Sequence, residues 1–175
     1  VARCALTLVI LHCLVQIPVH SQPSSHFYIV YHNLRLGSNR QRQDLSGCAL
    51  GMAAARRFYA VKYIRLPDLF IELDAARQNG AYEDVLAKYA KPTLLILDEW
   101  LMPELSKADV EFLLELTERR FDSTSTIFCT LYKREDWVKR LRGGTYAESI
   151  VERFAHNTIW VETGDVNMRQ YLSHA

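Results

Sequence analysis

The chain has 175 residues, of which 49% are hydrophobic and 23% are charged. This composition is close to that of an average globular domain, and it excludes a largely disordered chain and fibrous rods of the collagen or coiled-coil kind. Lys and Arg together number 21 against 20 Asp and Glu, so the formal net charge is +1 and any contact with nucleic acid must come from a local basic patch.

The amino-terminal segment differs from the rest of the chain. Residues 4–19 are almost wholly apolar and have the layout of a secretory signal peptide. The stretch is short for a membrane span, and His12 and Gln16 interrupt it. Because the remainder of the chain reads as a cytosolic fold, we expect a cytoplasmic protein without a membrane partner. We expect one folded domain over residues 27–175, with residues 1–26 outside it. The four cysteines form no C-x-x-C pair, and we expect them to be reduced.

The body of the chain alternates between strand and helix patterns. Apolar, β-branched or aromatic runs predict strands at residues 27–36, 60–65, 93–97, 125–129 and 157–161. Apolar residues at helical spacing predict helices at residues 68–79, from Ser106 through Phe121, at 147–156 and at 167–173. Gly80 ends the first helix, and Ser106 with Asp109 resembles a capping box at the start of the second. This alternation predicts an α/β fold with a parallel sheet and helices on both faces.

The sharpest motif is a pair of acids that follows a buried strand. Leu94–Leu97 is apolar without alternation, and Asp98 and Glu99 come directly after it, as in a Walker B element. In a parallel sheet, ligands bind beyond the carboxyl ends of the strands. There Asp98 could hold Mg²⁺, directly or through water, and Glu99 could orient or deprotonate the water that attacks a γ-phosphate. The alternative is an ordinary strand followed by a polar turn.

Three further polar residues are candidates for the same site. Thr130 follows the next buried strand and could sense the phosphate or the attacking water. Arg153 and Arg169 could each reach a triphosphate, Arg153 from a neighbouring subunit and Arg169 within the same chain. The alternatives are a simple strand terminus for Thr130 and solvated helix surfaces for the two arginines.

A Walker B element requires a phosphate-binding loop, and the place for it follows Leu36. The stretch from Gly37 to Gly47 keeps the first glycine but lacks the second glycine and the Lys-Thr pair of the Walker A motif. Its arginines and glutamines cannot form the same nest of backbone N–H groups. Residues 39–46 can be encoded by codons that, read one base later, give Thr-Gly-Ser-Gly-Lys-Thr-Tyr-Leu. We therefore hypothesise a local frameshift in a gene that once encoded an intact loop.

Several segments, in the same order, resemble the IstB-like transposition helper proteins, which are relatives of the DnaC helicase loaders. These segments are residues 48–51, 63–70, 94–100, 113–121, 125–130 and 148–157. The resemblance runs from about Tyr28 to the carboxyl end and implies a P-loop NTPase fold of the AAA+ type. It also implies bound ATP and Mg²⁺, DNA and a transposase as partners, and assembly into homo-oligomers.

The resemblance assigns roles to the candidate residues. It implies Asp98 and Glu99 as the Walker B pair, Thr130 as the sensor, Arg153 as the arginine finger, Arg169 as the second sensor, and Gly37 as part of the nucleotide site. Two departures matter. The Lys-Thr pair is absent, which leaves ATP binding and hydrolysis by this chain open, and residues 1–26 replace the family's amino-terminal helical extension.

Two basic groups are candidates for contact with DNA. One is Arg56–Arg57, and the other surrounds Trp137 and consists of Lys133, Arg134, Lys139, Arg140 and Arg142. The alternative for the second group is a solvated basic face, offset by Glu135 and Asp136. The sequence thus predicts an IstB-like ATP-binding helper of DNA transposition that is degenerate because the Walker A motif is lost. A nucleotide-free partner-binding module and a DnaC-like helicase loader are the alternatives.

Overall fold

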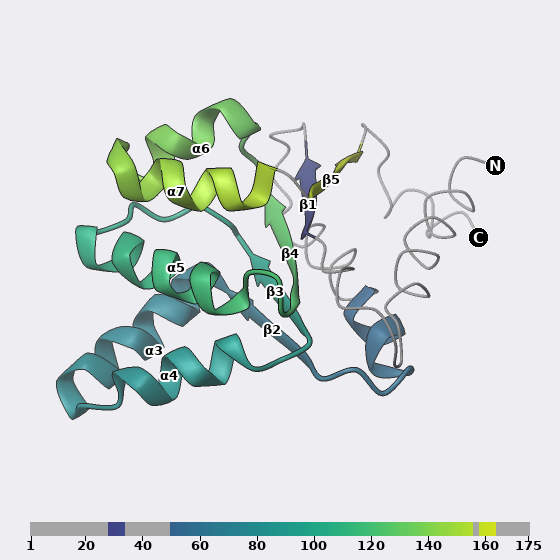
Figure 1. Cartoon of the computed structure of the whole chain (residues 1–175), viewed down its shortest axis with the longest axis horizontal. Coiled ribbons are helices and arrows are strands. Elements are labelled where there is room, and N and C mark those ends of the chain that lie inside the picture. The colour runs from purple at the N-terminus through teal and green to yellow at the C-terminus, as the bar shows by residue number, and fades with distance from the viewer. Residues whose placement is uncertain (1–27, 34–49, 156–157, 164–175) are drawn as a thin grey trace, which may run out of the picture.

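The computed structural model describes residues 28–33, 50–155 and 158–163, so the loop around Gly37, Arg169 and residues 1–27 lie outside the described residues. The described strands form one parallel sheet in the order β2-β3-β4-β1-β5 (Figure 1). In chain order these strands are β1 (Tyr28–Asn33), β2 (Val61–Arg65), β3 (Leu94–Asp98), β4 (Ser125–Thr130) and β5 (Thr158–Thr163). The predicted α/β fold with a parallel sheet is confirmed.

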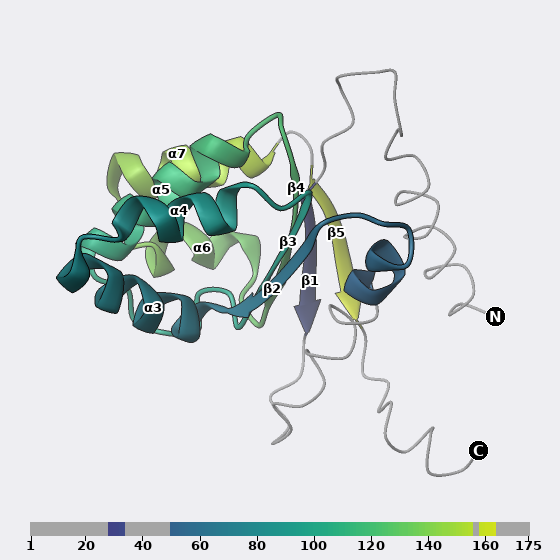
Figure 2. The ribbon, with the colours of Figure 1, turned by 90° about the horizontal axis from the view of Figure 1, so that it is seen from below.

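Helices cover both faces of this sheet. The five labelled helices are α3 (Leu66–Asn79), α4 (Tyr82–Ala90), α5 (Lys107–Arg120), α6 (Arg134–Arg140) and α7 (Gly144–Ala155). All five lie on one face, whereas the helical residues 50–55 lie on the other (Figure 2). Compared with the predicted ranges, α3 begins two residues earlier and α7 three residues earlier, and α4 was not predicted.

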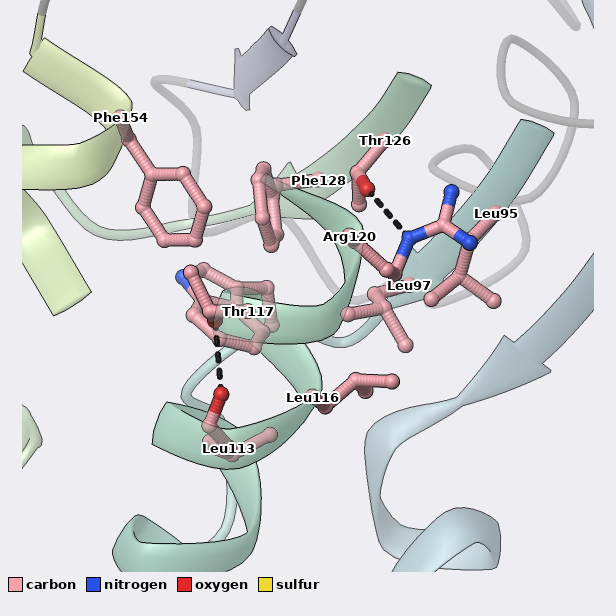
Figure 3. A pocket seen from close by; sticks show the side chains of 10 residues that line it. Leu95, Leu97, Leu113, Leu116, Thr117, Arg120, Thr126, Phe128 and Phe154 are labelled. Carbon is pink, nitrogen blue, oxygen red and sulfur yellow. Dashed lines mark hydrogen bonds between the residues drawn. The ribbon is translucent and has the colours of Figure 1, made fainter. Parts of the chain in front are cut away.

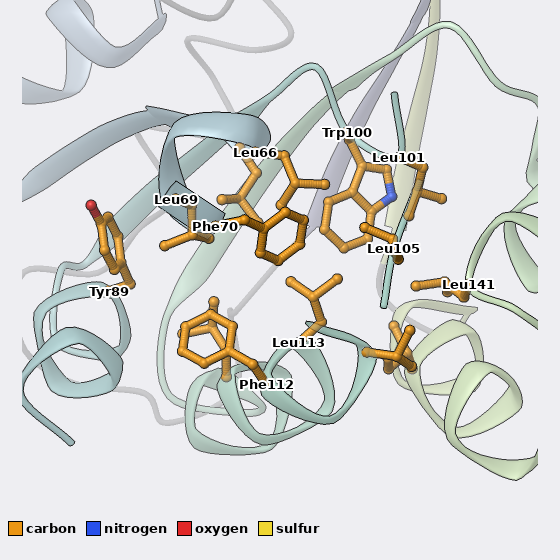
Figure 4. Packing of buried hydrophobic residues seen from close by; sticks show 14 of the residues in the cluster. Leu66, Leu69, Phe70, Tyr89, Trp100, Leu101, Leu105, Phe112, Leu113 and Leu141 are labelled. Carbon is orange, nitrogen blue, oxygen red and sulfur yellow. The ribbon is translucent and has the colours of Figure 1, made fainter. Parts of the chain in front are cut away.

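The side chains of β3 alternate between two hydrophobic clusters. All five residues of this strand are buried. Leu95 and Leu97 join the larger cluster under the five helices, part of which Figure 4 shows, whereas Leu94 and Ile96 join the smaller cluster under residues 50–55. A Cβ atom on Gly51 would lie 2.8 Å from Cδ1 of Ile96, so the glycine allows this helical segment to approach the sheet closely. A strand buried on both faces explains the unbroken apolar run in the sequence.

Local signals set the ends of two helices as predicted. Gly80 caps α3 with a left-handed φ of 70°, which suits a residue without a Cβ. At the start of α5, the Asp109 amide donates to Ser106 Oγ at 3.2 Å, and the Ser106 amide donates to Asp109 Oδ2 at 2.9 Å, which completes the capping box. Phe121, where the predicted helix ends, is the C-cap residue of α5 and is 41% exposed.

The residue buried at that end of α5 is Arg120, which is only 2% exposed. Its guanidinium donates to Thr126 Oγ1 at 3.0 Å (Figure 3) and to the backbone carbonyls of Tyr89, Ala90, Pro92 and Ser125. It thereby joins the end of α4, the loop before β3 and the beginning of β4. Arg120 also lines a small, mostly apolar cavity between the sheet and α5. A buried guanidinium with this many acceptors is a structural clamp at the amino edge of the sheet.

Candidate nucleotide site

The candidate site lies at the carboxyl edge of the sheet. β3 ends at Asp98, which pairs with Arg65 at the end of β2. β4 ends at Thr130, which pairs with His32 near the end of β1. Because all these strands are parallel, their carboxyl ends meet at one edge, where α/β proteins bind ligands. β1 ends at Asn33, so the chain enters residues 34–49 from this same edge.

The carboxylate of Asp98 is buried and accepts hydrogen bonds from Glu99 and Tyr63. The residue is 0% exposed. Its Oδ1 accepts the backbone N–H of Glu99 at 2.8 Å, and its Oδ2 accepts the hydroxyl of Tyr63 at 2.7 Å. These bonds fix the orientation of Asp98, and a carboxylate is the kind of side chain that binds Mg²⁺ directly or through a metal-bound water.

Glu99 is partly exposed and begins a strained turn. Its φ is 52°, and that of Leu101 is 61°, in the left-handed region that residues with a Cβ rarely occupy. Glu99 Oε1 lies 3.7 Å from Nη1 of Arg65, whose guanidinium also donates to both carboxylate oxygens of Asp68 at 2.7 and 2.8 Å. The hydrogen bonds to Asp68, with a smaller effect of Glu99, raise the pKa of Arg65. Such strain is typical of functional turns.

Thr130 is fully buried and its hydroxyl binds the turn next to Glu99. Oγ1 donates to the Trp100 carbonyl at 3.0 Å and accepts the Tyr132 amide at 3.1 Å. The Trp100 amide in turn donates to the Cys129 carbonyl at 2.8 Å. A direct hydrogen bond from this hydroxyl to phosphate would require that the bond to Trp100 be given up. The geometry therefore makes Thr130 a residue that positions the acidic turn, and its role as a sensor stays a prediction.

The structure separates Arg153 from the acidic pair. This arginine lies in the last turn of α7, where its guanidinium donates to Glu118 Oε1 at 2.8 Å and to the Ser149 carbonyl at 3.0 Å. Glu118 belongs to the last turn of α5, beside the amino end of β4, so Arg153 lies at the sheet edge opposite to Asp98. Within one chain it cannot reach a nucleotide at Asp98, and its predicted role requires a neighbouring subunit.

The basic group around Trp137 is divided in two. Arg140 donates from Nη2 to the carbonyls of Leu101 and Met102 at 2.6 and 2.9 Å, and Arg142 donates to the Leu105 carbonyl at 2.9 Å. These two arginines hold the segment that follows Glu99. By contrast, Lys133 and Lys139 are exposed, and the guanidinium of Arg134 lies 5.9 Å from the ring centre of Trp160. Contact with DNA stays a prediction for the group as a whole.

The supporting residues Tyr63, Arg65 and Arg140 were not identified from the sequence as parts of the site. The sequence contained a signal for Tyr63 and Arg65. They lie on either side of the apolar Ile64 at the end of β2, and this alternation places both side chains on the same face of the sheet. Nothing in the local sequence marks Arg140, whose acceptors lie 37 to 39 residues away.

The described residues were also compared with the requirements of a metal-binding cluster and of a membrane-spanning helix. In residues 28–33, 50–155 and 158–163, no three His, Cys, Asp or Glu side chains lie together as a metal-binding group. One carboxylate suits Mg²⁺, which binds nucleotide phosphates and water as its other ligands. In the same ranges, no helix combines the length and apolarity needed to cross a bilayer. Cys129 is buried.

Comparison with known proteins shows which sequences and structures the chain is similar to. The family model of the IstB-like ATP binding proteins matches residues 37–174. An insertion sequence ATP-binding protein of Sinorhizobium fredii is 32% identical over 123 residues, which cover 70% of this chain and 50% of that protein. The ATP-binding protein of insertion sequence IS1162 from Pseudomonas fluorescens is 37% identical over 97 residues, which cover 55% of this chain and 42% of that protein. The chain thus spans about half the length of the curated relatives that it matches.

Two solved structures show the same fold. The DnaC helicase loader has a TM-score of 0.72 at 15% identity, and the alignment covers 94% of this chain and 91% of that one. DnaA from Aquifex aeolicus, bound to AMPPCP, has a TM-score of 0.70 at 16% identity, covering 95% of this chain and 50% of that one. At these identities the likeness concerns the fold alone, and it confirms the predicted P-loop fold of the AAA+ type.

Proposed function

The chain belongs to the family of IstB-like ATP-binding proteins, and from that premise we propose that it is an ATP-binding helper of DNA transposition that works on DNA with a transposase. The observation that carries the proposal is the acidic pair at the carboxyl edge of the sheet. Asp98 is buried and oriented by Tyr63, and Glu99 is only partly buried beside it. A nucleoside triphosphatase needs two such carboxylates: one held in place to bind the metal ion, and one that can contact the attacking water.

In this proposal each residue has a defined task. Bound Mg-ATP would supply the γ-phosphorus that water attacks. Asp98 would hold Mg²⁺ at the end of β3, directly or through a water molecule. Glu99 would orient the attacking water or accept its proton, for which its side chain must leave the neighbourhood of Arg65. Thr130 would keep the backbone of Trp100 in place, so that the strained turn presents Glu99 to the site.

The location of Arg153 supports a homo-oligomer as the working form. At the edge of the sheet opposite to Asp98, this arginine could act only on a nucleotide that another subunit holds. An arginine supplied in this way stabilises the charge that develops on the transferred phosphate. The ion pair with Glu118 would then be exchanged for contact with phosphate on assembly. We propose the cytoplasm, where DNA, ATP and a transposase are available, as the place of action.

A nucleotide-free partner-binding module is the second candidate, and a specific observation favours it. Residues 39–46 contain neither the lysine nor the threonine of a phosphate-binding loop. In that case the sheet and the acidic turn would persist as structure only. The likeness of the fold to the DnaC helicase loader also keeps a loader of replication as a third candidate.

A nucleotide titration separates the first two candidates. A fluorescent ATP analogue with Mg²⁺ would be titrated against the chain, against an Asp98→Asn variant, and against a variant whose residues 39–46 are replaced by Thr-Gly-Ser-Gly-Lys-Thr-Tyr-Leu. If the proposed function holds, the chain binds the analogue and Asp98→Asn weakens binding in the presence of Mg²⁺ only. Binding by the restored-loop variant alone would favour the partner-binding module and support the frameshift. If neither form binds, the nucleotide role is refuted.

Co-purification of partner proteins distinguishes the transposase role from the loader role. We expect the chain to co-purify with a transposase encoded beside its own gene, and not with a replicative helicase. Recovery of the helicase alone would favour the loader. The codons of residues 39–46 provide a second check, because codons that cannot yield Gly-Lys-Thr in the shifted frame would end the frameshift hypothesis.

A further inference from the structure

The turn that follows the helical residues 50–55 places a large side chain where a glycine is normal. The Phe58 amide donates to the Ala55 carbonyl at 2.9 Å, and the Tyr59 amide donates to the Ala54 carbonyl at 3.3 Å. These two bonds form a Schellman motif with Phe58 at the position after the cap. Its φ is 65°, so a residue with a bulky Cβ substituent occupies a left-handed conformation that favours glycine.

The ring of Phe58 provides no packing that would offset this strain. The residue is 99% exposed, and Met52 on the same helical segment is 57% exposed. A phenylalanine in water forfeits the stabilisation that burial would provide. A position that is both strained and fully exposed is explained by a contact with another molecule rather than by folding.

The charges beside this ring indicate the kind of molecule. Arg56 and Arg57 precede Phe58 directly, and both are exposed. Neither makes an ion pair within the part of the chain that the structure describes. The turn lies on the face opposite to the five labelled helices (Figure 2) and leads to Val61 at the start of β2, so it is at the amino edge of the sheet. It is therefore separate from the acidic site at Asp98.

We propose that Arg56, Arg57 and Phe58 form a contact site for single-stranded nucleic acid. The two guanidinium groups bind backbone phosphates, and the Phe58 ring stacks on a base. A single strand fits better than a duplex, because its bases offer their faces without the cost of unstacking a base step. This inference rests on the proposed role on DNA and assigns a site to it. An apolar pocket on a protein partner would take the ring but would leave the two arginines without acceptors.

The conformation of the turn supplies a sharp test, because Phe58→Gly removes the ring and also relieves the strain. Binding of a fluorescent oligodeoxythymidylate of about 20 nucleotides would be measured by anisotropy, with a hairpin duplex as the second probe. We expect Phe58→Gly to raise the dissociation constant for the single strand about 5- to 150-fold. The melting temperature of the variant should equal or exceed that of the parent chain. Ile71→Ala, at an apolar residue that is 69% exposed on α3, is the matched control and should bind as the parent chain does.

The arginines are tested by the salt dependence of binding. Replacing both Arg56 and Arg57 by alanine should lower the slope of log K against log salt concentration by about 1.4, because each single-strand phosphate that is no longer neutralised accounts for about 0.7. Unchanged affinity in both Phe58→Gly and the double variant would overturn the proposal. A weakening confined to the duplex probe would also overturn it in favour of insertion into duplex DNA. Nucleic-acid binding unaffected by Phe58→Gly, together with a failure to co-purify with the transposase, would instead assign the turn to a protein partner.

Failure of the nucleic-acid site at Phe58 can be distinguished from failure of the proposed function in the nucleotide titration. If the chain binds the oligonucleotide through Phe58 but binds no ATP analogue, the turn is a nucleic-acid site on a nucleotide-free module. If it binds the ATP analogue but Phe58→Gly changes nothing, the proposed function stands and the site at the turn is refuted.

Discussion

Replacement of Arg120 by methionine should be the most destabilising single change among the polar residues of the described core. Methionine fills much of the space of the arginine stem but offers no donor. The change leaves four backbone carbonyls and the Thr126 hydroxyl without the guanidinium that now binds them. A buried acceptor left without its donor typically costs about 1–3 kcal/mol. Because several acceptors lose their donor here, we expect a loss of at least about 3 kcal/mol, a large share of the total stability of about 5–15 kcal/mol for a domain.

The assay is urea unfolding followed by tryptophan fluorescence, since Trp100 and Trp137 are both buried. Arg119→Met is the matched control: it is the preceding residue, but its ion pairs with Glu83 and Glu115 are exposed and should be worth about 1 kcal/mol or less. Arg120→Lys keeps a charge and up to three donors and should fall between the two. If Arg120→Met costs no more than Arg119→Met, the clamp interpretation is refuted.

Three other changes test further parts of the structure. Tyr63→Phe removes one donor from buried Asp98 and should lower the free energy of unfolding by about 1.5–3 kcal/mol, the usual worth of a hydrogen bond to a charged group; an unchanged urea midpoint would contradict it. Burial, followed by a hydrogen bond to a carboxylate, raises the pKa of Tyr82 to about 12 from 10.0. The folded state thus favours the neutral phenol, which contributes to the free energy of unfolding. This contribution is complete below pH 10 and should be lost as the pH rises from about 10 to 12. Tyr82→Phe, measured over the same range, should lose less stability than the parent chain; equal losses would refute the assignment. Gly51→Ala places a methyl group 2.8 Å from Cδ1 of Ile96 and should cost about 1–3 kcal/mol by overpacking, as checked by thermal unfolding; a gain in melting temperature would show that the core adapts.

What the sequence predicted well depends on neighbours along the chain. The strand before Asp98 is an unbroken apolar run, and a strand buried on both faces needs nothing else to be recognised. The capping box of Ser106 and Asp109 is likewise complete within four residues. The residues that determine these features are adjacent in the sequence. The fold and the acidic pair could therefore be predicted from it.

What the sequence did not show depends on partners far along the chain. Arg120 is buried because carbonyls about 30 residues earlier converge on it, and nothing in its own helix distinguishes it from the exposed Arg119. The same holds for Tyr63, whose hydroxyl reaches Asp98 across 35 residues. At the end of α5, the polar side chain of Arg120 is buried, whereas the aromatic ring of the next residue, Phe121, is 41% exposed.

The bond between Arg140 and the segment after Glu99 links two parts of the molecule that the sequence keeps 39 residues apart. Arg140 ends α6, the helix whose Lys139 is exposed to solvent. One of the carbonyls that accept its hydrogen bonds belongs to Leu101, which like Glu99 has a left-handed backbone conformation. A displacement of the end of α6 would therefore act directly on the backbone of Leu101, two residues from Glu99, so a partner that binds α6 would have a short route to the acidic turn.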